Sequence, residues 1–577
     1  MHPLAKLDHQ YIWHPFTQMR DWLKHQPIVI AEAKGALLRD IHGKEYLDAN
    51  SSIWTNLHGH NHPRLNAAIR RQLSKIAHSS ALGFANEPAS LLAEQLVRAA
   101  NPPRAQPSDP GSEAFRDTTA NGDATLNRKS QFANRNSTAS SALANHALSK
   151  VFFSDDGSTA MEVALKLSYE STRRTFPGRR PRFLSLEGAY HGDTVGAVSL
   201  GHIDLFHRTY SGLLFKTDSV MAPYCYRCRF NRAKPERADA REYRRCNWEC
   251  LGQLERKFSR QAAKGAPYSA FVFEPLIQGA AGMIPQPDGW LRRAAQIARE
   301  HGAQLIADEI MTGFGRTGAG LEAAPGTRPP LANNRAPAPS EISNLKSQIS
   351  NLKRQTANPR SQISNLKSEI AGSSPVASEP QSGDELSSLF ASHHEGVQPD
   401  FMALAKGLSG GYLPMAATLT TRAVFEAFLG DYEEFKTFFH GHSFTANQLG
   451  ASAALASLEL LSTPASRRAR LRLETDLRDA LQSLWPLPAV GDIRQVGLVA
   501  GIELVRDWRT RDPFDLGERA GIGVCDLMAK RGVLTRPIGN VIVLIPPYCT
   551  TRSQVRRMVG ALHDAIDEWR RNRKPRR

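Results

Sequence analysis

Three positions in this sequence carry residues whose types could do chemistry together. Lys406 follows the apolar run 401–405 and precedes a glycine-rich turn; partial desolvation there would lower the pKa of the amine and make it nucleophilic. Asp308 closes the apolar run 305–307, where a carboxylate could hold a protonated ring nitrogen. Gly157 and Ser158 precede a predicted helix that begins near Thr159, and the free N–H groups and dipole of a helix start favour a phosphate.

Each of these residues also has an ordinary structural explanation. A lysine can extend from a strand end into solvent, an aspartate can cap a helix or form an ion pair, and a Gly-Ser pair often precedes a helix. The chemical interpretation requires that the three positions meet in the fold. Whether they meet depends on the elements that carry them.

Short apolar runs alternate with helical patterns along most of the chain. The segments 181–188, 269–279, 303–310 and 400–407 each begin with an apolar run and end at polar or glycine residues, and 151–174 has the pattern of a strand, a turn and a helix. Such alternation indicates an α/β fold with a parallel sheet, which places its ligands at the carboxyl ends of the strands. Lys406 and Asp308 are both predicted at such ends.

Two segments differ from the rest of the chain. Residues 101–149 are rich in Asn, Ser, Thr, Ala and Pro, with no sustained periodicity, which predicts a disordered insertion. Residues 323–388 contain SEISNLK once and SQISNLK twice in one seven-residue register. Pro359 interrupts that register and would break a helix, so a low-complexity insertion is favoured over an oligomerising coiled coil.

The composition excludes several classes of protein. Of 577 residues 41% are apolar and 22% charged, so the chain is not wholly disordered, and no apolar run is long enough for a membrane-spanning helix. No secretory signal is recognisable at the start. Six cysteines are too few for a disulfide framework, which favours the cytoplasm. The net charge of +17 would suit nucleic acid, but much of it gathers in the tail 570–577 and in 224–260, so no nucleic-acid partner is predicted.

Together these residues resemble a known family. The motifs LIADEIMTGFGRTG (305–318) and QPDFMALAKGLSGGYLPMAATLTT (398–421) are similar to the signature of class III aminotransferases, which depend on pyridoxal 5'-phosphate (PLP). The resemblance implies the type I fold of PLP enzymes: a large domain with a mixed or parallel sheet and a smaller α+β domain. It makes Lys406 the lysine that binds the cofactor covalently and Asp308 the partner of its pyridine nitrogen.

The same resemblance implies a domain organisation. The expected parts are an N-terminal part of the small domain (1–75), the large PLP-binding domain (76–430) with the two insertions, an interface segment and return helix (431–465), the C-terminal small domain (466–569) and a basic tail (570–577). A homodimer is expected, because family active sites are completed by the partner chain.

Further motifs resemble one branch of the class, which aminates 8-amino-7-oxononanoate to 7,8-diaminononanoate in biotin synthesis. They are YIWHPFTQM (11–19), ANSSIWTNLHGHNHP (49–63), GAYHGDTVGAVSLG (188–201), FFHGHSFTANQLG (438–450) and LTRPIGNVIVLIPPY (534–548). By this likeness the catalytic residues are Lys406, Asp308 and Tyr190, the last stacked on the cofactor ring. Cofactor contacts would come also from Gly157, Ser158, His442 and Ser443, the last across the dimer interface. The substrate site would contain Phe16, Ile53, Trp54, Tyr190, Lys406, Gly441 and Arg536, with Arg536 pairing with the substrate carboxylate.

Two departures from that branch concern the amino donor. Where its well-known members have a tyrosine and a tryptophan, this chain has Phe16 and Ile53. The loss of an aromatic wall weakens the cation–π contact that would suit the sulfonium of adenosylmethionine. Adenosylmethionine is favoured narrowly over lysine as the donor. The alternative activity is another class III reaction, on ω-amino acids or diamines.

Other candidate sites in the sequence point elsewhere. Cys225, Cys228, Cys246 and Cys250 have a spacing close to that of a structural zinc site. A zinc-stabilised, basic nucleic-acid-binding protein is therefore the alternative from a different class, but it would make the Lys406–Asp308 pair incidental. His58, His60 and His62 occur at every second position, a spacing that metal ligands can have. A glycine-containing loop near the substrate is the better explanation for this spacing. No metal is expected in the active site.

Overall fold

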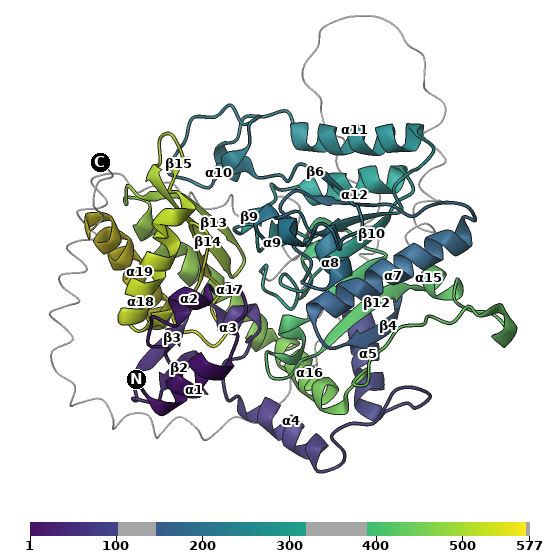
Figure 1. Ribbon diagram of the computed structural model, residues 1–577, viewed down its shortest axis with the longest axis horizontal. Helices are drawn as coiled ribbons and strands as arrows, with labels where there is room; N and C mark the ends of the chain where they lie inside the picture. Colours follow the sequence, from purple (N-terminus) through teal and green to yellow (C-terminus); the bar gives the residue numbers. More distant parts are fainter. Residues whose placement is uncertain (102–145, 319–388, 573–577) are drawn as a thin grey trace, which may run out of the picture.

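A computed structural model describes residues 1–101, 146–318 and 389–572 of this chain (Figure 1). Most of the two predicted insertions, and the end of the basic tail, lie outside the described residues. The second insertion, 323–388, lies wholly outside them, whereas residues 101 and 146–149 of the first are described. A strand begins at Leu148, so the predicted disorder does not extend to the end of that range.

The large domain is built on a seven-stranded mixed sheet (Figure 1). Strand β12 is antiparallel to both of its neighbours, and the other pairings are parallel. In spatial order the strands are β4 (Leu148–Ser154), β12 (Ala416–Thr421), β11 (Phe401–Leu404), β10 (Gln304–Asp308), β7 (Ala270–Phe273), β5 (Phe183–Leu186) and β6 (Asp218–Val220). The predicted fold class is confirmed.

Each face of this sheet is covered by its own buried apolar cluster, and successive side chains of a strand point into the two clusters in turn. In β10, Leu305 and Ala307 pack into one buried cluster and Ile306 into another, as expected for a strand whose successive side chains point to opposite faces. Helix α7 (Gly157–Thr175) supplies Ala160, Met161 and Ala164 to the cluster that contains Ile306. Helices α11 (Glu249–Ala263) and α12 (Trp290–Glu300) cover the opposite face. Burial on both faces explains why these strands are continuously apolar.

The small domain is assembled from both ends of the described chain, which lie side by side in Figure 1. Val533 and Leu534 pair in parallel with Leu47 and Asp48. Its first sheet contains β1 (Ile30–Lys34), β2 (Leu37–Asp40), β3 (Glu45–Asp48) and β16 (Val533–Leu534); its second contains β13 (Val490–Val496), β14 (Val499–Asp507), β15 (Asp512–Pro513), β17 (Pro537–Ile538) and β18 (Val541–Leu544).

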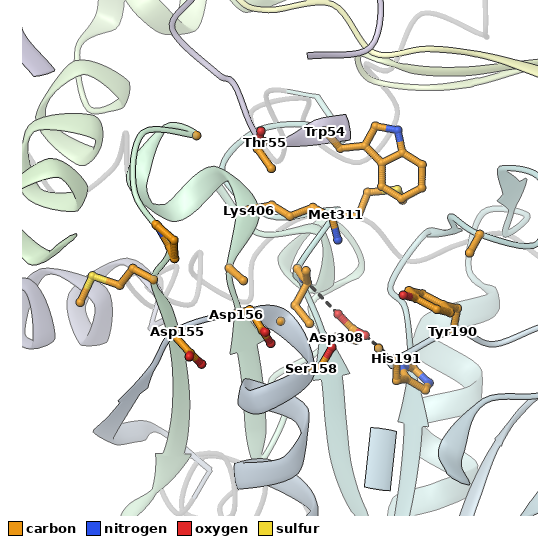
Figure 2. A pocket seen from close by; sticks show the side chains of 18 of the residues that line it. Trp54, Thr55, Asp155, Asp156, Ser158, Tyr190, His191, Asp308, Met311 and Lys406 are labelled. Carbon is orange, nitrogen blue, oxygen red and sulfur yellow. Dashed lines mark hydrogen bonds and ion pairs between the residues drawn. The ribbon is translucent and has the colours of Figure 1, made fainter. Parts of the chain in front are cut away.

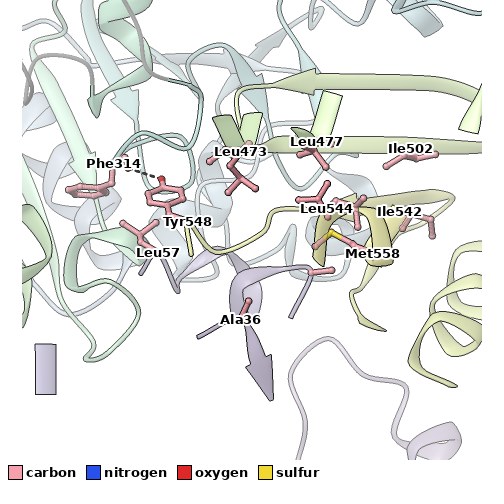
Figure 3. Packing of buried hydrophobic residues seen from close by; sticks show 14 of the residues in the cluster. Ala36, Leu57, Phe314, Leu473, Leu477, Ile502, Ile542, Leu544, Tyr548 and Met558 are labelled. Atoms are coloured by element: carbon pink, nitrogen blue, oxygen red, sulfur yellow. Dashed lines mark hydrogen bonds between the residues drawn. The ribbon is translucent and has the colours of Figure 1, made fainter. Parts of the chain in front are cut away.

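A continuous apolar core joins the two domains (Figure 3). Leu57 and Phe314 pack in the same cluster as Leu477 and Ile542 of the small domain. The buried hydroxyl of Tyr548 donates a hydrogen bond of 2.7 Å to the carbonyl of Phe314. The buried polar tip is thus satisfied, as burial requires.

The remaining helices lie around these sheets. They are α1 (Pro3–Tyr11), α2 (Met19–Trp22), α3 (Ser51–Trp54), α4 (Pro63–Leu73), α5 (Glu87–Ala99), α8 (Val195–Leu200), α9 (Asp204–His207), α10 (Ala240–Tyr243), α15 (Arg422–Glu426), α16 (Gln448–Leu461), α17 (Pro464–Leu481), α18 (Ala520–Lys530) and α19 (Arg552–Asn572). In the described ranges no helix has the length and apolar character needed to cross a membrane.

The short element α3 is a left-handed turn. Ser51, Ser52, Ile53 and Trp54 have φ angles of 46°, 47°, 64° and 69°. A β-branched residue such as Ile53 rarely adopts this region. The turn is held by Ser51 Oγ, which donates to the carbonyl of Ile545 (2.6 Å), and by Ser52 Oγ, which donates to Asp48 (3.0 Å). It sets the direction in which Trp54 leaves the backbone.

Candidate active site

One cavity of about 490 Å³ opens at the carboxyl ends of the parallel strands (Figure 2). Each strand contributes polar side chains where it ends, as open α/β sheets do. The lining includes Asp155 and Asp156 after β4, Tyr190 and His191 after β5, Glu274 after β7, Asp308 at the end of β10, and Lys406 after β11. Its size is that of a small-molecule site.

Lys406 extends into this cavity toward Trp54 and Met311 (Figure 2). Its Nζ lies 5.5 Å from the centre of the Trp54 ring, within range of a cation–π contact. Burial lowers the pKa of the amine, and the carboxylates of Asp308 and Glu274 oppose that shift. A buried amine with a lowered pKa is a stronger nucleophile at neutral pH than a lysine in solvent.

Asp308 is buried beneath Lys406 with both carboxylate oxygens engaged (Figure 2). Oδ2 is 2.8 Å from Nδ1 of His191, and Oδ1 accepts a hydrogen bond of 3.1 Å from the N–H of Ile310. His191 is itself buried. These two contacts fix the orientation of the carboxylate.

The start of helix α7 forms another wall of the cavity. The Asp156 side chain caps the helix by accepting a hydrogen bond of 2.9 Å from the N–H of Thr159. A Cβ on Gly157 would come within 2.9 Å of Ile310 Cγ2, so a larger residue would not fit. Ser158 Oγ accepts a hydrogen bond from the N–H of Asp193 (3.1 Å). A compact anion could therefore approach the helix N-terminus closely.

Two carboxylates that were not predicted act at the site: Glu274 lines the cavity, and Asp193 holds the hydroxyl of Tyr190. The hydroxyl of Tyr190 donates to Asp193 (2.7 Å), and burial together with that carboxylate raises the pKa of Tyr190. Glu274 accepts a hydrogen bond from the N–H of Gly279 (2.7 Å), and burial raises its pKa to about 7. Their signals in the sequence were GAYHGD (188–193) and the apolar run that Glu274 follows.

The structure brings only part of the predicted set into this cavity. Trp54, Gly157, Ser158, Tyr190, Asp308 and Lys406 all line it. The other predicted residues, which do not line it, are Phe16, Ile53, Gly441, His442, Ser443 and Arg536.

These other residues occupy exposed or neighbouring positions. Phe16 packs its ring 5.3 Å from Phe206, which lies 6.1 Å from Tyr190. Nε2 of His442 is 4.0 Å from Asp155. Arg536 is exposed between β16 and β17. Their predicted roles stay predictions.

The alternative sites have other arrangements. Cys225 and Cys250 are buried, which raises the pKa of each thiol, to about 12 and about 11. Within the described ranges, no cluster of three or more His, Cys, Asp or Glu could hold a metal ion. His58 hydrogen-bonds to Ser457 (2.9 Å), and His60 to Asp48 (3.0 Å). Both hydrogen bonds hold the loop in place, and neither histidine lines the cavity.

Comparison with known proteins agrees with this geometry. The sequence model of the family described as aminotransferase class-III matches residues 19–140, 121–329 and 379–566. The adenosylmethionine-8-amino-7-oxononanoate aminotransferase of Geobacter sulfurreducens is 37% identical over 98% of this chain and 97% of its own. The enzyme of the same name from Anoxybacillus flavithermus is 37% identical over 97% of this chain and 95% of its own.

Solved structures lead to the same family. The crystal structure of adenosylmethionine-8-amino-7-oxononanoate aminotransferase from Methanocaldococcus jannaschii is similar with a TM-score of 0.71 and 32% identity, over 98% of each chain. An omega transaminase from Pseudomonas jessenii, 23% identical with a TM-score of 0.73, covers 99% of each chain and shares the fold. This chain belongs to the class III aminotransferases.

Proposed function

We propose that this chain transfers an amino group to the ketone of 8-amino-7-oxononanoate, giving 7,8-diaminononanoate in biotin synthesis, with PLP as cofactor. The observation that carries the proposal is the convergence of Lys406, Asp308 and the start of α7 in one cavity. The chain that builds this cavity is 37% identical, nearly end to end, to relatives named for that substrate.

The cavity fits PLP in three separate respects. An amine that can bind its aldehyde is supplied by Lys406, and a buried carboxylate for its ring nitrogen by Asp308. The α7 N-terminus, where a Cβ on Gly157 or Gly192 would collide with its neighbours, leaves room for a phosphate at a helix dipole. When bound, PLP supplies an electron sink for the carbon that loses or gains the amino group.

The residues of this chain then have separate tasks. Lys406, with its pKa lowered by burial, would hold the cofactor through its amine and, when free, would move a proton at the reacting carbon. Asp308, held by His191 and the Ile310 N–H, would hold the ring nitrogen. Tyr190, which lines the cavity, would cover the ring. Because one cavity serves donor and acceptor in turn, ping-pong kinetics are expected.

The substrate contacts follow the sequence prediction. Trp54 lies beside Lys406 and would contact the substrate there. Arg536 is assigned to the substrate carboxylate because it lies in the motif LTRPIGNVIVLIPPY (534–548). Phe16 offers no hydroxyl, and Ile53 no aromatic face, to a sulfonium donor. Adenosylmethionine is favoured narrowly as the donor, with lysine as the alternative.

We assign the phosphate contacts of His442 and Ser443, and the substrate contact of Gly441, to a homodimer. The segments 78–86 and 443–448 bind each other through His78 to the Ser443 carbonyl (2.7 Å) and Asn86 to the Ala446 carbonyl (3.1 Å). Both present large exposed apolar side chains, among them Phe84 (72% exposed) and Phe444 (61%). Large apolar side chains exposed on two segments in contact are typical of an interface with another chain.

Light scattering of the purified protein should therefore give the mass of two chains. Replacement of Phe444 by Asp should lower the measured mass toward that of one chain. Activity should fall in parallel, because each site loses the residues that the partner chain supplies. A fully active monomer would refute the dimer.

Mass spectrometry of the reaction product tests the function. The protein is incubated with PLP, 8-amino-7-oxononanoate and either adenosylmethionine or lysine. Diaminononanoate formed with adenosylmethionine alone supports the favoured donor, and formation with lysine alone assigns donor choice to Phe16 and Ile53. A yellow protein that gives no product with either donor, but converts ω-amino acids or diamines, would keep the cofactor and overturn the substrate.

A further inference from the structure

Arg494 is a fully buried arginine that reaches from the small domain to the rim of the cavity. It lies on β13, and its guanidinium donates through Nε to the carbonyl of Met283 (2.7 Å) and through Nη2 to that of Gly282 (2.6 Å). Nε also lies 3.1 Å from the Gly282 carbonyl. The planar fork of a guanidinium can hold two adjacent carbonyls at once, which an ammonium cannot do with the same geometry.

The carbonyls it holds belong to a tight turn that forms part of the cavity wall. The turn joins β8 (Ile277–Gln278) to β9 (Ile284–Pro285) and is closed by the N–H groups of Gly282 and Met283, which donate to the carbonyl of Gly279. Ala280 of the turn lines the cavity.

Gly279 connects this turn to the side chains beside Lys406. A Cβ on Gly279 would lie 2.7 Å from the sulfur of Met311 and 3.4 Å from the Trp54 ring. Met311 and Trp54 both line the cavity. A displacement of the turn therefore moves the wall against which a substrate must fit.

The position of Arg494 is itself fixed by two buried carboxylates. Nη1 lies 3.0 Å from Asp492 and 2.7 Å from Glu503. Glu503 also accepts hydrogen bonds from Tyr224 (2.6 Å) and Arg227 (2.9 Å). A buried cation needs such partners, because desolvation otherwise outweighs its attractions. The segment that contains the cysteines is thus linked through Glu503 and Arg494 to the cavity.

We propose that Arg494 is a positioning residue: by holding the turn 279–283 it fixes the wall formed by Trp54 and Met311, and so sets the fit of the amine and ketone substrates. Arg494 itself does not line the cavity. The inference rests on the proposed function only for the identity of those substrates.

The test compares Arg494→Lys with Arg506→Lys. Lysine keeps the charge next to Asp492 and Glu503 but can satisfy only one of the two carbonyls. Arg506 is the control: although partly exposed, it also pairs with carboxylates, those of Asp512, Asp515 and Glu518, and it donates to a carbonyl in the small domain, away from the cavity.

The first readout is hydrogen exchange of the backbone amides in 279–284. This measurement does not depend on enzymatic activity. In Arg494→Lys the amides of Gly282 and Met283 should exchange about tenfold faster, while those of β10 remain unchanged. The second readout is kinetic: KM for 8-amino-7-oxononanoate should rise about tenfold with kcat within about twofold, the signature of lost ground-state fit. Arg506→Lys should leave both readouts at the level of the original protein.

Unchanged amide exchange in the turn of Arg494→Lys would overturn the proposal. A fall in kcat and in the amount of bound PLP as large as the rise in KM would also overturn it, because it would indicate a general structural role. If the original protein forms no diaminononanoate, the proposed function fails on that measurement alone. The exchange comparison still decides whether Arg494 holds the turn.

Discussion

At the scale of single residues, burial shifts the pKa of two side chains in the cavity, lowering that of Lys406 and raising that of Glu274. Asp308 is oriented by two contacts, one of them with the buried ring of His191, which also lines the cavity. At Glu274, burial is only partly offset by its hydrogen bonds, and its pKa rises to about 7.

Replacement of His191 by Phe should lower kcat on the order of a hundredfold, because the Asp308 carboxylate loses the hydrogen-bond partner that fixes its orientation. His191→Asn retains a donor and should lose less than about tenfold. The measurement is kcat against pH for both variants with PLP bound. Equal losses in the two variants would show that packing, rather than the hydrogen bond to Asp308, is what His191 provides.

Glu274 should make stability fall as pH rises. Its pKa in the folded state, about 7, exceeds its ordinary value of 4.5, so between these values the folded state binds more protons than the unfolded one and loses stability with increasing pH. Glu274→Gln removes this contribution. The Tm difference, variant minus original, should therefore become more positive from pH 5 to pH 8, on the order of a few degrees. A difference that is constant with pH would contradict the assignment.

At the scale of elements, strained backbone occurs in α3 and at Lys406, the two places that bring the Trp54 ring next to the Lys406 amine. Four consecutive residues of α3 have positive φ, and Lys406 has φ 40°. Non-glycine residues in this region store on the order of 1 kcal/mol or more each, and such strain is typical of sites that orient a side chain. The hydrogen bonds of Ser51 and Ser52 maintain the turn.

Ile53→Asn should stabilise the protein by about 1 kcal/mol, because asparagine tolerates the left-handed region that a β-branched side chain resists. Little packing is lost, since Ile53 is 45% exposed. Ile76→Asn is the control: that residue is also 45% exposed but has no positive φ. Thermal unfolding of both variants checks this, and equal changes in Tm would refute the role of strain.

At the scale of the whole molecule, the chain enters and leaves each undescribed range at neighbouring points. The side chain of Asn101 hydrogen-bonds to both the N–H (2.9 Å) and the carbonyl (2.7 Å) of Leu148. Gly315 donates to the carbonyl of Leu389 (2.9 Å). The fold therefore needs only a short connection at either place.

Short Gly/Ser linkers in place of 103–144 and 320–387 should leave Tm within about 3 °C and kcat within about twofold, because the residues that flank each range are already hydrogen-bonded to each other. Unfolding by circular dichroism and the product assay measure both. A folded but inactive variant would show that one of these segments takes part in catalysis.

Much of the fold and part of the site could be predicted from sequence. The strand ends at Asp308 and Lys406 were predictable because a short apolar run followed by a polar residue is a local signal. The contact of His191 with Asp308 was not, since 117 positions separate them and only the sheet order brings them together. The antiparallel direction of β12 and the left-handed turn at Ile53 depend likewise on the packing around them rather than on local pattern.

The pairing of β3 with β16 has a consequence for synthesis on the ribosome. Ser51 next to β3 donates to the carbonyl of Ile545, 494 positions later, so the N-terminal sheet cannot complete its edge until almost the entire chain has been translated. Until then that edge is an unpaired template for other chains. Nascent chains that stall before β16 should consequently depend on chaperones and be degraded as a whole, including the N-terminal segments already made.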